Sequence, residues 1–182
     1  MRHLTTTQLE AGLADIRQSP RTVGTVELIV ARPAVDERVT LDEAQLDLAE
    51  GLVGDSWRAR GSGRAGDGAP DPDTQLNVMN ARAIALVAQD RSRWALAGDQ
   101  LYLDLDLSGD NLPAGTQLAL GTAIIAVTAT PHRGCAKFSQ RFGRDALRFV
   151  NSPVGRQLRL RGLNARIIQP GTVRRGDTVH KL

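Results

Sequence analysis

The sequence predicts a mainly β protein with a closed, barrel-like architecture and several peripheral helices. Many short segments alternate between apolar and polar residues or are rich in β-branched residues, and glycine and proline turns separate them. Hydrophobic residues make up 41% of the chain but aromatic residues only 3%, so aliphatic side chains must build the core. A length of 182 residues suits one domain.

A helical extension is expected at the N-terminus, over residues 1–21. Three apolar residues recur there with the spacing of one helix face: Leu9, Leu13 and Ile16. Thr7 and Glu10 have the spacing of a capping box, and a proline ends the segment. Residues 22–182 are then expected to form a single domain.

The first strands of that domain follow directly. Residues 23–33 form a β-rich run that ends at a proline, and residues 46–48 alternate two leucines with an aspartate. Glycines at both ends of the segment 51–54 predict a turn. Residues 58–73 are dense in Gly, Ala, Asp and Pro, which predicts an exposed, flexible loop within the domain.

The middle of the chain predicts strands around one helix. Residues 74–80 suit a short strand, and Asn80 can cap a helix over residues 81–90. Residues 101–107 alternate without a break, with four leucines on one face and a tyrosine and two aspartates on the other. We interpret the two aspartates as the solvent side of this strand. A β-branched strand follows over residues 123–130.

The last part of the chain predicts helices and then two closing strands. Residues 136–150 have a helical pattern that Gly143 interrupts, and a proline can open another short helix over residues 153–160. Residues 163–168 and 177–182 then read as strands around glycine-containing turns.

Composition excludes several classes of protein. One cysteine cannot form an internal disulfide, and no segment has the roughly 18 apolar residues of a membrane span. We therefore expect a cytoplasmic protein without membrane contact. A zinc site is not expected, because His3, His132 and His180 are scattered. Nucleic acid is not an expected partner either, because aromatic stacking residues are few and no recognition motif is present.

The positive charge gathers in the last third of the chain. Residues 130–182 carry 12 Arg and Lys but 2 Asp and Glu, whereas residues 1–129 have a net charge of −7. Nearly all the basic residues are arginine, whose guanidinium fork matches phosphate and carboxylate oxygens. Two interpretations stay open. The arginines can form an anion-binding face, or they can pair with acidic strands elsewhere in the fold.

The single cysteine, Cys135, lies where a strand ends and a helix is expected to begin. Free amides at a helix start and the nearby His132, Arg133 and Lys137 would favour a thiolate. Such a thiolate can attack electrophilic sulfur, carry a persulfide or bind a soft metal. Gly134 would let the backbone approach a ligand closely. The alternative is an inert, buried cysteine.

Several motifs in a fixed order give the chain a resemblance to a known family. These motifs are Gly-Asp at 54–55, Leu-Ala-Leu-Gly at 118–121, Thr-Pro-His-Arg-Gly-Cys at 130–135 and Gly-Thr-Val-Arg-Arg-Gly-Asp at 171–177. From about residue 22 onward the chain resembles the MOSC family. This domain is found at the C-terminus of molybdenum-cofactor sulfurases and in stand-alone bacterial proteins.

The resemblance implies a β-barrel-like MOSC fold and a role in sulfur transfer or in binding the molybdenum cofactor (molybdopterin). It implies that Cys135 is a persulfide carrier or a molybdenum ligand. Gly54 and Asp55 match a family turn at the cofactor site, and three neighbours of the cysteine are carried over by proximity as cofactor-binding residues: His132, Arg133 and Lys137.

The same resemblance implies a molybdenum-dependent oxidoreductase or a sulfur transferase, with a sulfur donor or an electron-transfer protein as partner. It also brings an association with pyridoxal phosphate binding. A second hypothesis keeps the protein non-catalytic. In that case the arginine-rich last third of the chain binds a small anionic ligand or an acidic partner.

Overall fold

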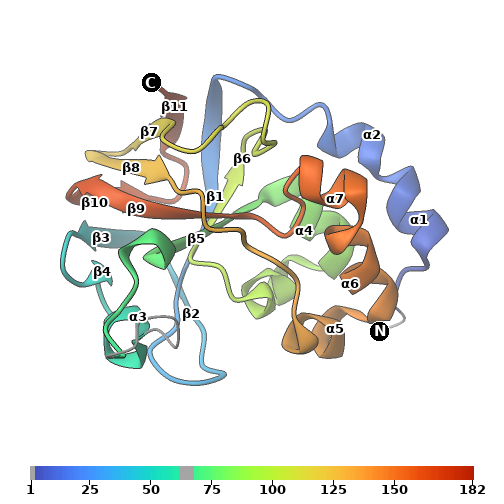
Figure 1. Cartoon of the computed structure of the whole chain (residues 1–182), viewed down its shortest axis with the longest axis horizontal. Coiled ribbons are helices and arrows are strands. Elements are labelled where there is room, and N and C mark those ends of the chain that lie inside the picture. Colours follow the sequence, from blue (N-terminus) through green and yellow to red (C-terminus); the bar gives the residue numbers. More distant parts are fainter. Residues whose placement is uncertain (1–2, 62–67) are drawn as a thin grey trace.

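The computed structural model describes residues 3–61 and 68–182. Within them, strands close into a ring (Figure 1). The order around the ring is β1 (Val23–Ala31), β11 (Thr178–Lys181), β7 (Gln117–Leu120), β8 (Ala123–Val127), β9 (Leu163–Gln169), β5 (Leu76–Asn80) and β6 (Leu101–Asp104). Neighbours are antiparallel except for β5 and β6, which are parallel. The predicted closed β architecture is confirmed.

Shorter strands extend the barrel at one end. β2 (Val39–Leu41) pairs with the last residues of β1. A small sheet has β3 (Glu43–Asp47) between β10 (Gly171–Arg174) and β4 (Gly51–Leu52). The sequence pattern predicted a strand at residues 46–48, near β3, and a turn at residues 51–54, where the structure has β4. It did not predict β2 or β10, which are short and gain their order from pairing.

The predicted loop over residues 58–73 lies partly outside the described residues. Its described ends are helical, because α3 (Trp57–Arg60) begins it and the 3₁₀ turn η1 (Pro72–Thr74) ends it. Trp57 is buried, and the side chain of Asp71 caps η1. The first end therefore packs into the fold through Trp57, and the second end is ordered by the cap of η1.

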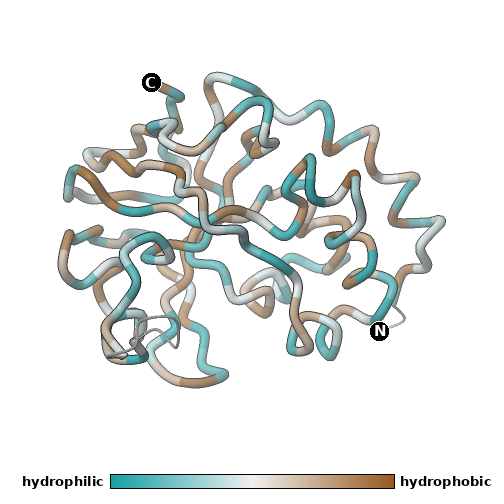
Figure 2. The backbone as a smooth tube through the Cα atoms, in the orientation of Figure 1, coloured by the Kyte–Doolittle hydropathy of each residue, from teal (hydrophilic) through white to brown (hydrophobic). Residues whose placement is uncertain are grey.

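Two hydrophobic clusters lie on opposite sides of the barrel wall. In β1, Val26 and Ile29 belong to the cluster that fills the barrel, and Leu28 and Val30 belong to the cluster beneath the helices. A bulge between Val26 and Leu28 resets the alternation. Figure 2 shows the resulting apolar stretches along the central strands and on the inner side of the helices. Both faces of this wall are therefore dry.

Helices cover one side of the barrel, at the right of Figure 1. They are α1 (Thr6–Ala11), α2 (Leu13–Ile16), α4 (Ala81–Ala88), the 3₁₀ helix η2 (Arg91–Ala97), α5 (Ala136–Phe142), α6 (Arg144–Asn151) and α7 (Pro153–Gln157). None of the helices in the described residues is long and apolar enough to cross a membrane. The break predicted at Gly143 is confirmed, since its φ of 94° separates α5 from α6.

The N-terminal helix begins earlier than the sequence pattern indicated. The capping box predicted for Thr7 and Glu10 is wrong. Thr5 has an extended backbone, its hydroxyl accepts from the Gln8 amide, and its own amide donates to Gln8 Oε1 at 2.9 Å. Thr7 therefore lies inside the first turn. Leu9 packs into the cluster beneath the helices, so the extension is attached to the barrel.

The strand predicted over residues 101–107 is shorter, and its second face is only partly exposed to solvent. β6 ends at Asp104, although all four leucines do point into the barrel. Tyr102 is fully buried under the helices, and its hydroxyl donates to the Trp94 carbonyl at 2.8 Å. Asp104 accepts from Arg82 of α4 at 2.8 Å, and the side chains of Asp104 and Asp106 are 29% and 20% exposed. The predicted solvent side is therefore wrong for Tyr102 and confirmed in part for the two aspartates.

Asn80 joins the barrel to the helical layer, as its predicted capping role requires. Its Oδ1 accepts from the Ala83 amide at 2.8 Å, and its Nδ2 donates to Ser19 Oγ and the Leu105 carbonyl. We predict that Asn80→Ala lowers the free energy of unfolding by about 3 kcal/mol, because a cap and two buried hydrogen bonds are lost together.

Urea unfolding followed by circular dichroism measures this loss. Asp90→Ala is the matched control, because it removes an exposed cap of η2 and should cost about 1 kcal/mol. Equal losses in the two variants would show that the buried contacts of Asn80 contribute nothing.

Candidate functional site

A cavity of about 310 Å³ opens at the end of the barrel where β1 leaves the ring. We call it the thiol cavity, because Cys135 lies on its wall. Six cationic side chains line it: Arg32, Arg38, Arg60, Lys137, Arg141 and Arg161. His132 lies on the same wall. The cavity therefore combines a thiol, an imidazole and a cluster of positive charges.

Cys135 is the N-cap residue of α5, so the helix begins where the sequence predicted. Its backbone is extended, its side chain caps no amide, and the residue is exposed. The alternative of a buried cysteine is wrong for this fold. Position 134, directly before it, has no room for a side chain, because a Cβ on Gly134 would lie 2.8 Å from Leu147 Cδ1. Gly134 thus serves close packing on α6, where its amide donates to Asn151 Oδ1, and not the approach of a ligand.

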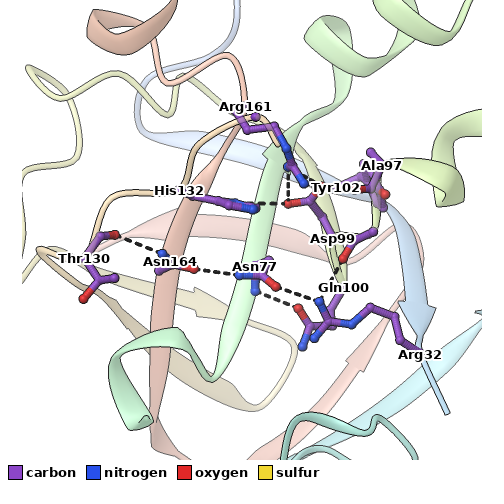
Figure 3. Close-up of polar contacts among 12 residues, drawn as sticks. Arg32, Asn77, Ala97, Asp99, Gln100, Tyr102, Thr130, His132, Arg161 and Asn164 are labelled. Carbon is purple, nitrogen blue, oxygen red and sulfur yellow. Dashed lines mark hydrogen bonds and ion pairs between the residues drawn. The ribbon is translucent and has the colours of Figure 1, made fainter. Parts of the chain in front are cut away.

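His132 reaches a buried ion pair behind the cavity wall (Figure 3). Asp99 is fully buried and accepts both its bonds from Arg161 Nη1, at 2.9 and 2.7 Å. His132 Nδ1 lies 3.4 Å from Asp99 Oδ1 but forms no hydrogen bond with it. Burial lowers the pKa of His132 well below its ordinary value, and the charges of Arg161 and Arg32 lower it further. The imidazole is therefore neutral at pH 7.

Asp55 supports the cavity from behind and does not line it. Its carboxylate is fully buried and accepts from Arg32 Nε at 2.8 Å, from Arg32 Nη2 at 3.0 Å and from the Trp57 amide. Arg32 Nη1 is held by Asn77 Oδ1 and the Gly98 carbonyl, at 2.7 and 2.8 Å. Every nitrogen of this guanidinium is thus fixed, and its charge is placed at the cavity wall.

A chain of hydrogen-bonded side-chain amides extends this network from β5 to the neighbouring strand β9 (Figure 3). Asn77 Nδ2 donates to Asn164 Oδ1 at 2.6 Å, and Asn164 Nδ2 donates to the Thr130 carbonyl at 3.0 Å. The chain joins β5 to β9 and then to the segment that carries Cys135. Buried polar groups that satisfy one another in this way fix a single arrangement. The position of the cysteine segment is therefore tied to that of Arg32.

Carboxylates balance only part of the positive charge. Asp36 accepts from Lys137 Nζ at 3.1 Å and from Arg141 Nη2 at 2.6 Å, and these contacts lower the pKa of Asp36. With Asp55 and Asp99 there are three carboxylates for six cations. Arg38 has no carboxylate partner in the described residues, and burial and the charges of Arg141 and Arg32 lower its pKa. Counted over the described residues, the cavity therefore carries a surplus of three positive charges.

Comparison with known sequences identifies the family. The profile of the MOSC domain matches residues 69–180, which is more than half of the chain. The chain belongs to the MOSC domain family. No curated protein matches its sequence.

Solved structures agree in fold. YuaD from Bacillus subtilis superposes with a TM-score of 0.58 at 17% identity, covering 88% of this chain and 97% of that one. YiiM from Escherichia coli gives 0.54 at 20% identity, covering 87% and 69%. YiiM from Geobacillus stearothermophilus gives 0.52 at 15% identity, covering 89% and 73%. These TM-scores show that the chain shares its fold with the three proteins.

The structure separates the site residues predicted from the sequence. Cys135, His132 and Lys137 meet at the thiol cavity, whereas Arg133 lines a second cavity on the other side of His132. Gly54 has a φ of 88° and forms the turn that carries the buried Asp55. Neither residue of this turn lines the thiol cavity.

Sequence reasoning missed most of the cations. Arg32, Arg38 and Arg60 come from the acidic part of the chain, and no local pattern marked them. Of the basic last third, Arg174 and Arg175 instead pair with Glu43 and Asp42 on the small sheet. Pairing with acids is therefore confirmed for these arginines, and an anion-binding face stays a prediction for the others.

Removing the buried carboxylate should show how strongly Arg32 depends on it. We predict that Asp55→Ala lowers the free energy of unfolding by about 4 kcal/mol, because the Arg32 guanidinium then lacks a counter-ion in a dry site. Asp42→Ala breaks an exposed pair and should cost less than about 1 kcal/mol. Denaturant unfolding of both variants tests this. Similar small losses would contradict the structural role given to Asp55.

Acid should destabilise the MOSC domain through His132. Its folded pKa is depressed, so below about pH 6.5 the unfolded chain takes up a proton that the folded chain does not. Stability from this residue is complete above pH 6.5 and falls by up to about 1.4 kcal/mol for each pH unit below it. His132→Gln should remove this part of the slope when unfolding is measured between pH 7.5 and 5.5. Identical slopes in the two proteins would contradict a neutral, buried His132.

Proposed function

We propose that this MOSC domain binds an anionic cofactor of the molybdopterin type in the thiol cavity, with the Cys135 sulfur as a ligand to molybdenum. The observation that carries the proposal is the position of this thiol on the wall of a cavity with three surplus positive charges. A thiolate is the kind of soft ligand that suits such a metal, and guanidinium groups suit the phosphate of a pterin cofactor.

The donor set of the cavity fits this group. Arg38 Nε and Arg161 Nε are buried without a hydrogen-bond partner in the described residues, and so is His132 Nδ1. Buried polar atoms in folded proteins are nearly always paired, so unpaired donors at a cavity support an oxygen-rich ligand there. Such a cofactor, when bound, supplies two-electron redox chemistry at molybdenum.

Different residues of the thiol cavity would bind different parts of the cofactor. Cys135 would hold the metal, and Arg38 and Arg60, which have no carboxylate partner in the described residues, would hold the phosphate. The neutral His132 can donate or accept a hydrogen bond at the wall without adding charge. The carboxylate of Asp36 would hold the side chains of Lys137 and Arg141 at the opening of the thiol cavity. An electron-transfer protein is the partner that this function requires.

The exposure of Cys135 favours a second function, that of a sulfur carrier. Its thiolate would attack the terminal sulfur of a donor persulfide, R–S–SH. A Cys135–sulfur bond forms, the bond between the two donor sulfurs breaks, and R–S⁻ leaves with the electron pair. This transfer needs an exposed thiol and a donor protein that can reach it. A non-catalytic module for an anionic ligand would use the same cations and leave the thiol idle.

Metal and mass analysis of gently purified protein distinguishes these functions. In cells that make the cofactor, the wild-type protein should carry molybdenum and pterin, and Cys135→Ala should lose at least about tenfold of the metal, equivalent to 1.4 kcal/mol or more in affinity. Arg38→Gln should lose pterin as well. Arg17→Gln is the matched control, because Arg17 is exposed and lies outside both cavities.

The other outcomes would select the other functions. A wild-type protein without metal but with one added sulfur atom on Cys135 would support the sulfur carrier. Anion binding that survives Cys135→Ala but weakens in Arg38→Gln, and more so in added salt, would support the binding module. A protein with no metal, no added sulfur and no anion affinity would overturn the proposed function.

A further inference from the structure

A second cavity, of about 210 Å³, lies next to the thiol cavity and shares His132 and Arg161 with it. We call it the arginine cavity, because four arginines line it: Arg133, Arg156, Arg159 and Arg161. No carboxylate is among its lining residues. It is built by the segment before α5, by α6 and α7, and by the turn that leads into β9. Cys135 and Lys137 are not part of it.

The charges of this cavity are poorly balanced. Arg133 and Arg156 are exposed, and their side chains form no hydrogen bond or ion pair in the described residues. Arg159 donates to the carbonyls of Leu112 and Leu107, at 2.6 and 3.5 Å, and has no carboxylate partner there. Among the described residues, Arg161 is the one arginine of this cavity that is paired with an acid, Asp99. The other three arginines therefore line one small space without an acidic partner in that part of the chain.

Arg161 adds a donor that points to a missing ligand. Its side chain is only 7% exposed, and Nη1 and Nη2 are already bonded to Asp99 and the Ala97 carbonyl. Its Nε is buried and has no partner in the described residues. An unpaired buried donor costs free energy unless a ligand satisfies it. An acceptor in one of the two cavities that Arg161 lines would remove this cost.

Arg159 is held at this wall by an unusual backbone. Its φ of 49° places it in the left-handed region, which a residue with a Cβ adopts at a cost of about 1–3 kcal/mol. Burial also lowers the pKa of this guanidinium. The strained backbone thus holds at the cavity wall a partly buried arginine without an acidic partner in the described residues, and backbone strain of this kind clusters at binding sites.

We propose that the arginine cavity binds a phosphate group, either as inorganic phosphate or as a small phosphomonoester. A dianion with oxygens on all sides can accept from several guanidinium groups at once, which a single carboxylate cannot do. A cavity of about 210 Å³ holds a phosphate with a small substituent. The site is separate from the thiol cavity and does not depend on the proposed cofactor.

Calorimetric titration of the purified full chain tests this, with inorganic phosphate and phenyl phosphate as probes. The Arg133→Gln/Arg156→Gln double variant should bind phosphate at least about tenfold more weakly than the wild type. Both side chains are exposed and form no hydrogen bond or ion pair in the described residues, so these substitutions should leave the fold unaffected. Arg17→Gln, an exposed arginine outside both cavities, should bind as the wild type does.

A variant outside both cavities tests where the anion binds. Arg144→Gln should keep phosphate affinity within about twofold of wild type, because Arg144 is an exposed arginine of α6 that lines neither cavity. Tighter binding of phenyl phosphate than of inorganic phosphate would identify an ester as the ligand, and the reverse would identify the free ion. No binding of either probe, an unchanged affinity in the double variant, or an equal loss in Arg144→Gln would each overturn the proposal. Failure here leaves the metal and sulfur experiments on Cys135 unaffected.

Discussion

Two buried arginine–aspartate pairs determine how the barrel end of this MOSC domain is built. Arg32 directly follows β1, and its fully buried partner Asp55 lies in the turn after β4. Arg161 precedes β9, and its partner Asp99 precedes β6. Isolated charges could not stay in this dry region, so each guanidinium requires its carboxylate. The segments that carry these four residues must therefore meet, and the thiol cavity forms between them.

The pairs also explain why the cavities keep their positive potential. Each of these two aspartates pairs with one arginine behind the wall, and the exposed Arg60, Arg133 and Arg156 have no acidic partner in the described residues. Low-dielectric walls strengthen the field of these charges over a small volume. His132 lies between the cavities and stays neutral, so the wall that they share adds no charge of its own. Structural and ligand-facing cations thus have separate roles.

Local patterns predicted the fold well because strand alternation, caps and helix breaks are properties of neighbouring residues. Asn80 and Gly143 are examples. Cys135 could be found because it is the single cysteine, beside a predicted helix start. Arg32 could not, because its role depends on Asp55 and Asn77, which come close only in the folded barrel. The family turn at Asp55 was recognised, but its buried supporting role was not.

Closure of the barrel depends on residues that are far apart in the chain. Residues 23–25 of β1 pair with residues 178–180 of β11. Contacts of such long sequence separation form slowly, because much of the chain must be ordered first. During synthesis on the ribosome, all the cations of both cavities emerge before β11 does. The sites therefore mature only after β11 has been synthesised, and until then the barrel has an open edge at which the nascent protein needs protection from aggregation.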